Sequence, residues 1–125
     1  MFDHPVSNGP KPAPRNIGEV YVDTLVNHGG TFDRKMFASV LFTDGYLVAT
    51  RAVAHAHVQK ADVAWFRRVW PHRGSLVGTW IDPATSVVWI DVVTHTPFLG
   101  VARAIGSING EIAIWDCARG ESITL

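Results

Sequence analysis

Two histidines separated by one residue, His55 and His57, come closest in this sequence to a set of side chains that could do chemistry. Residues two apart on a strand face the same side, so both imidazoles could bind one Zn²⁺ at about 2.0–2.1 Å per nitrogen. A zinc site needs at least one further protein ligand. The sequence offers four candidates without fixing any of them: His72, His95, Asp91 and Cys117. A small metal-dependent enzyme is therefore one hypothesis. The alternative is that the two histidines bind no metal and are simply exposed or hydrogen-bonded at a strand end.

Several carboxylates lie near the ends of expected strands: Asp82, Asp91, Glu111, Asp116 and Glu121. Two carboxylates can share acid–base work when one of them lies in an apolar pocket that raises its pKa. Asp82 is better explained as a turn residue, whereas Asp91 and Asp116 stand among apolar residues and are expected to be at least half-buried. Such carboxylates usually accept backbone hydrogen bonds or cap a helix. No serine or cysteine has a recognisable base partner, so the sequence names no catalytic residue and leans against an enzyme.

The segment from Asp62 to Arg73 combines arginines with large aromatic side chains. Arginine and tryptophan are enriched at protein-binding hot spots, although aromatics at helical spacing also commonly form a core. Nucleic acid is the weaker alternative, because eleven basic and eleven acidic residues cancel over the whole chain. Five tryptophans exceed what a core of this size needs, so at least one is expected to be exposed. The residues predicted to contact a protein partner are Trp65, Arg67, Arg68, Trp70 and Arg73.

A scaffold centred on residues 75–93 must position these side chains. Two apolar stretches flank a turn at residues 82–85, in which Pro83 presets φ and Asp82 can accept a backbone hydrogen bond. We predict a hairpin in which Asp82 pairs with Ser86. This register groups Trp80 with Val88, Ile90 and Val92 on one face, and groups Trp89 with Val77, Thr79, Ile81 and Val87 on the other. Because neither face is polar, the hairpin is expected at the centre of a sheet.

Three helices are expected around the hairpin. Residues 16–28 have nearly helical apolar spacing between a possible N-cap at Asn16 and a stop at Gly29-Gly30, and we favour a helix there over a strand. Residues 62–70 are expected to be helical up to Pro71. A third helix is expected to follow Pro97, with Thr96 as a candidate N-cap, and to bury an apolar stripe from Phe98 to Ile108.

Further strands are expected at residues 46–53 and 111–116, with a short last strand ending near Ile123 and an ambiguous one at residues 37–42. The order of elements predicts an α+β fold, in which two to three helices pack on a mostly antiparallel sheet with a central hairpin at about residues 75–93. A right-handed parallel crossover from the strand ending at Val93 to Glu111 is the alternative connection.

The composition predicts one small cytoplasmic domain. The 125 residues are 47% hydrophobic, and residues 16–125 are expected to form a single core. One cysteine, Cys117, excludes an internal disulfide and fits a reducing compartment. No apolar stretch approaches the roughly 20 residues of a membrane span. Residues 1–15 contain four prolines and are expected to be a disordered tail.

The pattern of short motifs resembles small uncharacterised proteins of phages and prophages from high-GC Gram-positive bacteria. The residues that carry the resemblance are His28 to Phe32, Gly45 to Val48, Gly78 to Asp82, Trp89 to Val92, Glu111 to Asp116 and Gly120-Glu121. The sequence departs from that pattern at Ser86, where the hairpin usually has glycine, and at Asn109-Gly110 before the last strands. The resemblance implies a mobile-element accessory protein and brings no catalytic residues with it.

The leading expectation for function is a non-enzymatic phage or prophage accessory protein that binds a host or viral protein. The alternatives are the metal-dependent enzyme at His55 and His57 and, more weakly, nucleic-acid binding. No resident cofactor is expected apart from zinc at the two histidines, and a homo-oligomer is left open.

Overall fold

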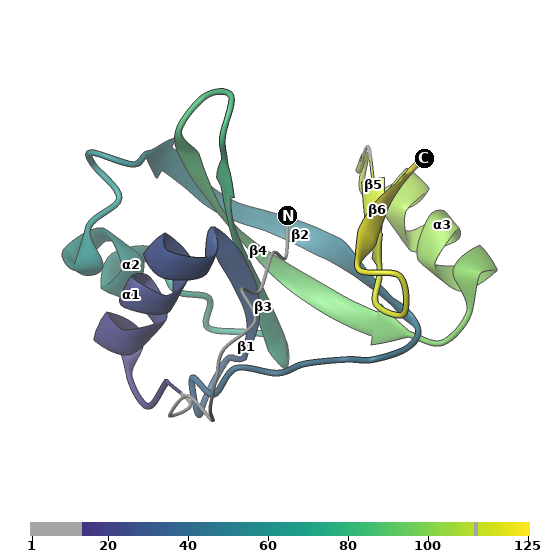
Figure 1. Ribbon diagram of the computed structural model, residues 1–125, viewed down its shortest axis with the longest axis horizontal. Helices are drawn as coiled ribbons and strands as arrows, with labels where there is room; N and C mark the ends of the chain where they lie inside the picture. The colour runs from purple at the N-terminus through teal and green to yellow at the C-terminus, as the bar shows by residue number, and fades with distance from the viewer. Residues whose placement is uncertain (1–13, 112) are drawn as a thin grey trace.

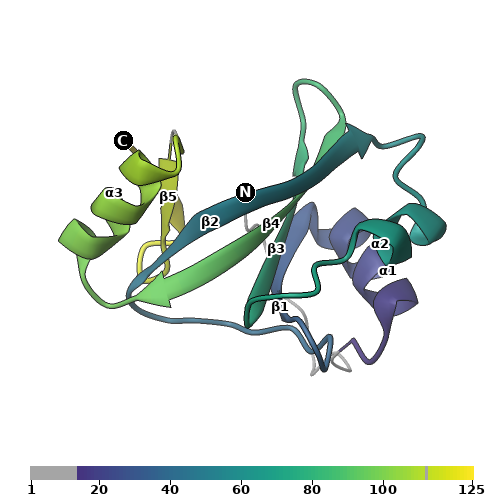
Figure 2. The same cartoon turned by 180° about the vertical axis from the view of Figure 1, so that it is seen from behind.

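The computed structural model describes residues 14–111 and 113–125, which form three helices and a six-stranded antiparallel sheet (Figures 1 and 2). The order of strands across the sheet is β1-β3-β4-β2-β5-β6. The elements in chain order are α1 (Ile17–Asn27), β1 (Gly29–Asp33), β2 (Tyr46–His57), α2 (Val63–Val69), β3 (Leu76–Asp82), β4 (Val87–Thr96), α3 (Leu99–Ile108), β5 (Ala113–Asp116) and β6 (Glu121–Thr124). The predicted α+β class, with a central hairpin and packed helices, is confirmed.

The first two helices begin at side-chain caps that the sequence indicates. The Asn16 side chain accepts a hydrogen bond from the backbone N–H of Glu19 at 2.9 Å, and Asp62 caps α2 through the N–H of Trp65 at 2.8 Å. The predicted glycine stop after α1 is wrong in detail. His28 ends the helix in the left-handed conformation (φ 64°), and Gly29 and Gly30 already belong to β1.

The strand expected at residues 37–42 is also wrong. The strand lies earlier, at β1, and pairs with β3, while Ser39 forms only an isolated bridge to Phe32. Asp33 explains the difference, because its carboxylate accepts hydrogen bonds from the N–H groups of Lys35 and Met36 and turns the chain directly after β1.

The central hairpin forms, but its register differs from the predicted one by one residue. Asp82 pairs with Val87 rather than Ser86, so that Trp80 lies opposite Trp89. Ser86 adopts a left-handed conformation (φ 57°) and donates its N–H to the carbonyl of Asp82 at 2.8 Å, which adds one residue to the loop. Since side chains alternate along a strand, this shift moves Trp89 to the face that carries Trp80.

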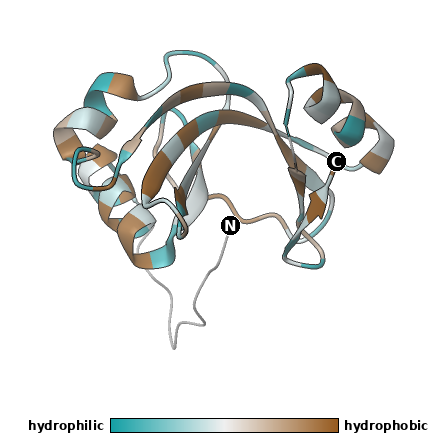
Figure 3. Cartoon of the chain, turned by 90° about the horizontal axis from the view of Figure 1, so that it is seen from above, coloured by the Kyte–Doolittle hydropathy of each residue, from teal (hydrophilic) through white to brown (hydrophobic). Residues whose placement is uncertain are grey.

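All three helices pack against one face of the sheet, in two separate clusters. The larger one joins α1 and α2 to β1, β3 and β4 through buried residues that include Val20, Phe66, Val77 and Ile90. The smaller one joins α3 to β2 and β5. Its buried members are Val48, Ala102 and Ile114. Figure 3 shows the strands as an arch, with α1 and α2 outside one end and α3 outside the other.

Helix α3 buries less of its apolar stripe than predicted. Phe98 and Ile108 are 66% and 84% exposed, and the helix contacts the sheet instead through Leu99, Ala102 and Ile105. The parallel crossover considered as an alternative does not form, because β5 pairs antiparallel with β2. The predicted Pro-rich tail falls almost entirely on residues 1–13, which lie outside the described part of the chain.

Candidate functional site

The face of the sheet that carries no helix gathers three of the five tryptophans. Trp80 and Trp89 are direct cross-strand partners on β3 and β4. Trp115 on β5 pairs with Leu47, which in turn pairs with His95 on the same side of β4. All three tryptophans are half-buried. No tryptophan is exposed, so the expectation of an exposed tryptophan is not met, and the partly accessible rings lie on this face of the sheet.

Two irregularities in β2 bend this face. The pairing of β2 with β4 shifts between Ala49 and Arg51 and again between Ala52 and Ala54. Each shift adds one residue to β2, and bulges of this kind bend a strand and increase its twist. They also keep Ala49, Ala52 and His55 on the tryptophan face, opposite Val93, Asp91 and Trp89 respectively.

The curved face contains a pocket of about 400 Å³. Its walls are the three tryptophans and its floor consists mainly of small or apolar residues, among them Ala49, Ala52, Gly78 and Val93. Gly78 lies directly opposite Asp91, and a Cβ atom at this position would lie 2.9 Å from Cγ1 of Val93. The absence of a side chain at Gly78 therefore leaves the space beside Asp91 open.

Asp91 and Glu111 are the two ionisable side chains that line the pocket among the described residues. Burial and, to a lesser extent, the negative charge of Glu111 together raise the pKa of Asp91 from 3.8 to about 6. Burial also raises the pKa of Glu111. Within residues 14–111 and 113–125, neither carboxylate has a hydrogen-bond or ion-pair partner. The pocket is thus apolar, aromatic and negatively charged.

The two histidines predicted as zinc ligands lie on β2 at the edge of the same face. The ring of His55 stacks on Trp89, with 4.4 Å between ring centroids, and Nδ1 of His57 accepts a hydrogen bond from the N–H of Gln59. No group of three potential metal-binding side chains occurs in the described part of the chain. Zinc binding at this pair stays a prediction. The contact that the structure shows for His55 is its stack on the ring of Trp89.

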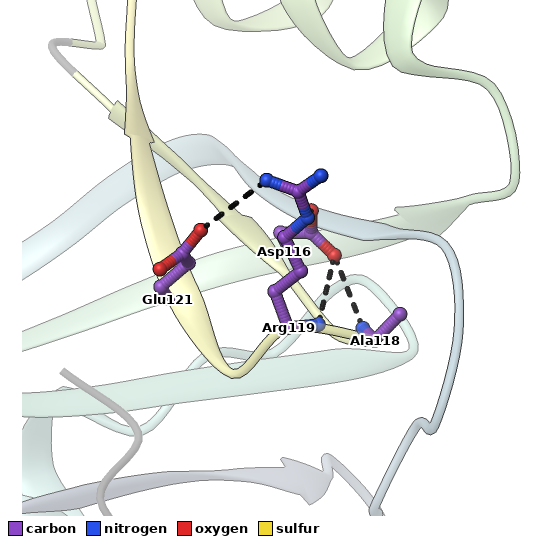
Figure 4. A network of polar contacts seen from close by, with 4 residues as sticks. All are labelled: Asp116, Ala118, Arg119 and Glu121. Carbon is purple, nitrogen blue, oxygen red and sulfur yellow. Dashed lines mark hydrogen bonds and ion pairs between the residues drawn. The ribbon is translucent and has the colours of Figure 1, made fainter.

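Asp116, the other carboxylate expected to be buried, serves the turn between β5 and β6 (Figure 4). It accepts hydrogen bonds from the N–H groups of Ala118 and Arg119 at 3.1 and 3.2 Å, and the Arg119 side chain lies 3.9 Å away. Neighbouring Cys117 has a pKa raised to about 11, mainly by burial, so its thiol stays protonated at neutral pH. Asp116 is a structural carboxylate, in contrast to Asp91.

The Asp62 to Arg73 segment does not present its tryptophans to solvent. Trp65 and Trp70 are only 7% and 8% exposed, and Nε1 of Trp70 donates to the carbonyl oxygen of Arg34 at 3.0 Å. The other three residues predicted to bind a partner are exposed: Arg67, Arg68 and Arg73. A partner that reached this segment would meet the arginines, and removing either tryptophan would open a cavity in the core.

Comparison with known proteins gives no identification. No protein-family model matches the chain, and neither the curated proteins nor the solved structures include a match. Among the described residues, none of the helices has the length and apolar character needed to cross a membrane. The function therefore has to be argued from the pocket.

Sequence reasoning found Asp91 as a half-buried carboxylate but missed the pocket around it. The spacing of Trp80 and Trp89 about the turn is the sequence signal that could have indicated the pocket. A loop of four residues between Asp82 and Val87 places these two tryptophans opposite each other. The sequence places Glu111 near the end of an expected strand without linking it to Asp91. Its approach to Asp91 depends on α3 leading the chain back to the sheet beside β2.

Proposed function

We propose that this protein is a non-enzymatic binding protein and that it takes a small ligand with an apolar body into the pocket on the helix-free face of the sheet. The observation that carries the proposal is a pocket of about 400 Å³ that is lined by three tryptophans and by a few polar residues, Asp91, Glu111 and Ser122. Small-molecule sites have about 300–1,000 Å³ and consist mostly of apolar and aromatic side chains with a few placed polar groups.

Non-enzymatic binding is favoured over catalysis by the chemistry of the described residues. The hydroxyl of Ser122 lines the pocket without a hydrogen-bonded base among the described residues, and burial keeps the Cys117 thiol protonated. The protein partner at Arg67, Arg68 and Arg73, the metal-dependent enzyme at His55 and His57, and an origin in a phage or prophage stay predictions. The pocket supports a small ligand more directly than it supports any of these.

A neutral fluorescent probe, N-phenyl-1-naphthylamine, tests the proposal, because its emission rises in an apolar site. We expect saturable binding of one probe per chain. Ala52→Phe should weaken it by about tenfold or more, since Ala52 lines the pocket opposite Asp91 and a phenyl ring there would fill the space. Ala84→Phe is the matched control, because Ala84 is exposed in the hairpin loop outside the pocket.

Two results would contradict the proposal. One is the absence of saturable probe binding to the unaltered protein. The other is equal binding to the unaltered protein and to the Ala52→Phe variant, because the probe would then occupy another apolar surface. Circular dichroism of both variants checks that the added ring leaves the fold intact.

A further inference from the structure

The charge of the pocket is not balanced by the described residues that surround it. Asp91 and Glu111 both line it, and no lysine or arginine of the described chain does. On β3, the residue that faces Asp91 is Gly78, and on β2 it is Ala52, so neither neighbouring strand supplies a donor. Other titratable groups on this face include His55, stacked on Trp89, and His95, stacked on Phe42.

We propose that the ligand is an organic cation, with its ammonium group against Asp91 and Glu111 and its apolar part among the tryptophan rings. This inference rests on the proposed function and names the chemical class of the ligand. Charge complementarity is the first argument for it, because two unpaired carboxylates in a partly dehydrated site repel anions and give a cation a partner.

The tryptophan walls are the second argument. The face of an indole ring attracts a cation electrostatically, and tryptophan does so better than other aromatic residues. Trp80 and Trp89 lie directly opposite each other across β3 and β4, and the stack with His55 fixes the orientation of the Trp89 ring. Carboxylates combined with indole faces therefore suit an ammonium group better than a neutral or anionic ligand.

A hard metal ion fits the site less well than an organic cation. Calcium takes six to eight oxygen ligands and magnesium needs a nearly octahedral set. Apart from Asp91 and Glu111, the described residues that line the pocket are mainly aromatic or aliphatic, and Ser122 adds one hydroxyl. The hydroxyl of Thr79 is directed away from the pocket, because it pairs with Thr24 in the core. A metal ion would leave most of the apolar volume of the pocket empty, whereas the apolar body of an organic cation would fill it.

Three probes that share a phenyl ring and differ in charge test the inference by calorimetry at pH 7.5 and low ionic strength. They are 2-phenylethylammonium, 2-phenylethanol and 3-phenylpropanoate. We expect the ammonium to bind about tenfold or more tightly than the alcohol, and the carboxylate to bind most weakly. The combined change Asp91→Asn and Glu111→Gln should reduce the advantage of the ammonium over the alcohol to about twofold or less, with the affinity for the alcohol unchanged.

Two controls separate a specific effect from a general one. Asp44→Asn removes an exposed carboxylate that does not line the pocket, so the ammonium should keep its full advantage in this variant. The affinity of the ammonium should also fall as the pH drops through about 6, and this loss should be smaller in Asp91→Asn. Since His55 and His95 also lie on this face, only the difference between the two proteins reports Asp91.

Several results would overturn the inference. Equal affinity for alcohol and ammonium would do so, as would an ammonium advantage that survives the double change. Displacement of the ammonium by stoichiometric calcium or magnesium would show a metal site instead. If N-phenyl-1-naphthylamine binds and 2-phenylethylammonium does not, only the ligand class is wrong. If neither binds, the proposed function fails as well.

Discussion

Replacing Asp91 by asparagine should make the protein more stable at neutral pH, and this follows from the position of the carboxylate in the pocket. Burial and Glu111 raise the pKa of Asp91 from 3.8 to about 6. A carboxyl group whose pKa is higher in the folded state favours folding while it is protonated. Its contribution is fully present below the unfolded pKa of 3.8 and is lost as the pH rises through about 6.

The size of the effect follows from the same shift. One pKa unit corresponds to 1.36 kcal/mol, so ionisation of Asp91 costs the folded state about 3 kcal/mol once the pH is well above 6. Most of this loss falls between pH 4 and pH 7, where it amounts to about 2 kcal/mol. Asparagine has nearly the same volume and no charge, so the Asp91→Asn variant should lack this component of the pH dependence.

Urea unfolding followed by circular dichroism at both pH values measures the effect. The free energy of unfolding of Asp91→Asn, relative to the unaltered protein, should rise by about 2 kcal/mol from pH 4 to pH 7. Asp44→Asn should show no comparable rise, and Glu111→Gln should show a smaller one, since it removes only the repulsive contribution of Glu111 to Asp91 and its own burial cost. A difference between Asp91→Asn and the unaltered protein that does not change with pH would refute the reasoning.

Three other substitutions test the scaffold through unfolding free energies. Thr24→Val should cost about 1–3 kcal/mol, because the hydroxyl groups of Thr24 and Thr79 lie 2.8 Å apart in the core and the remaining one loses its partner. The double variant Thr24→Val with Thr79→Val should regain most of that loss, and a double variant as unstable as the single one would contradict the pairing. Ser86→Gly should stabilise the hairpin by about 0.5 kcal/mol, since glycine adopts a left-handed φ without strain; destabilisation would count against the conformation of this loop. Asp62→Ala should cost about 1 kcal/mol through loss of the cap on α2, whereas no change would mean that the cap contributes little.

The helices and the hairpin were predictable because their signals are local. Asn16 and Asp62 are standard N-cap residues, and each caps the helix that the apolar spacing indicated. The turn at residues 82–85 was equally predictable, because Pro83 and Asp82 are typical turn residues. Strand β1 was missed since its two glycines carry no side-chain pattern and its partner, β3, lies more than forty residues further along the chain.

The pocket was hard to predict, because it depends on three backbone irregularities without a clear sequence signature, and the spacing of Trp80 and Trp89 about the turn is informative only once the register is known. The left-handed Ser86 shifts β4 by one residue and brings Trp89 opposite Trp80. The two bulges in β2 place Ala52 and His55 on the same face as these rings. A prediction that assumes regular alternation assigns Trp89 to the opposite face and spreads the tryptophans over both sides of the sheet.

The arrangement of the helices explains why this face can hold a ligand at all. Helices α1, α2 and α3 all cover one face, so half of a sheet that is apolar on both sides has no cover in the described part of the chain. A face of this kind usually marks a binding site in a folded protein. Asp91 strengthens the argument, because a carboxylate that costs the folded state stability at neutral pH has no evident structural use, whereas Asp116 holds a turn. A cation bound beside Asp91 would offset this cost and couple ligand binding to the stability of the sheet.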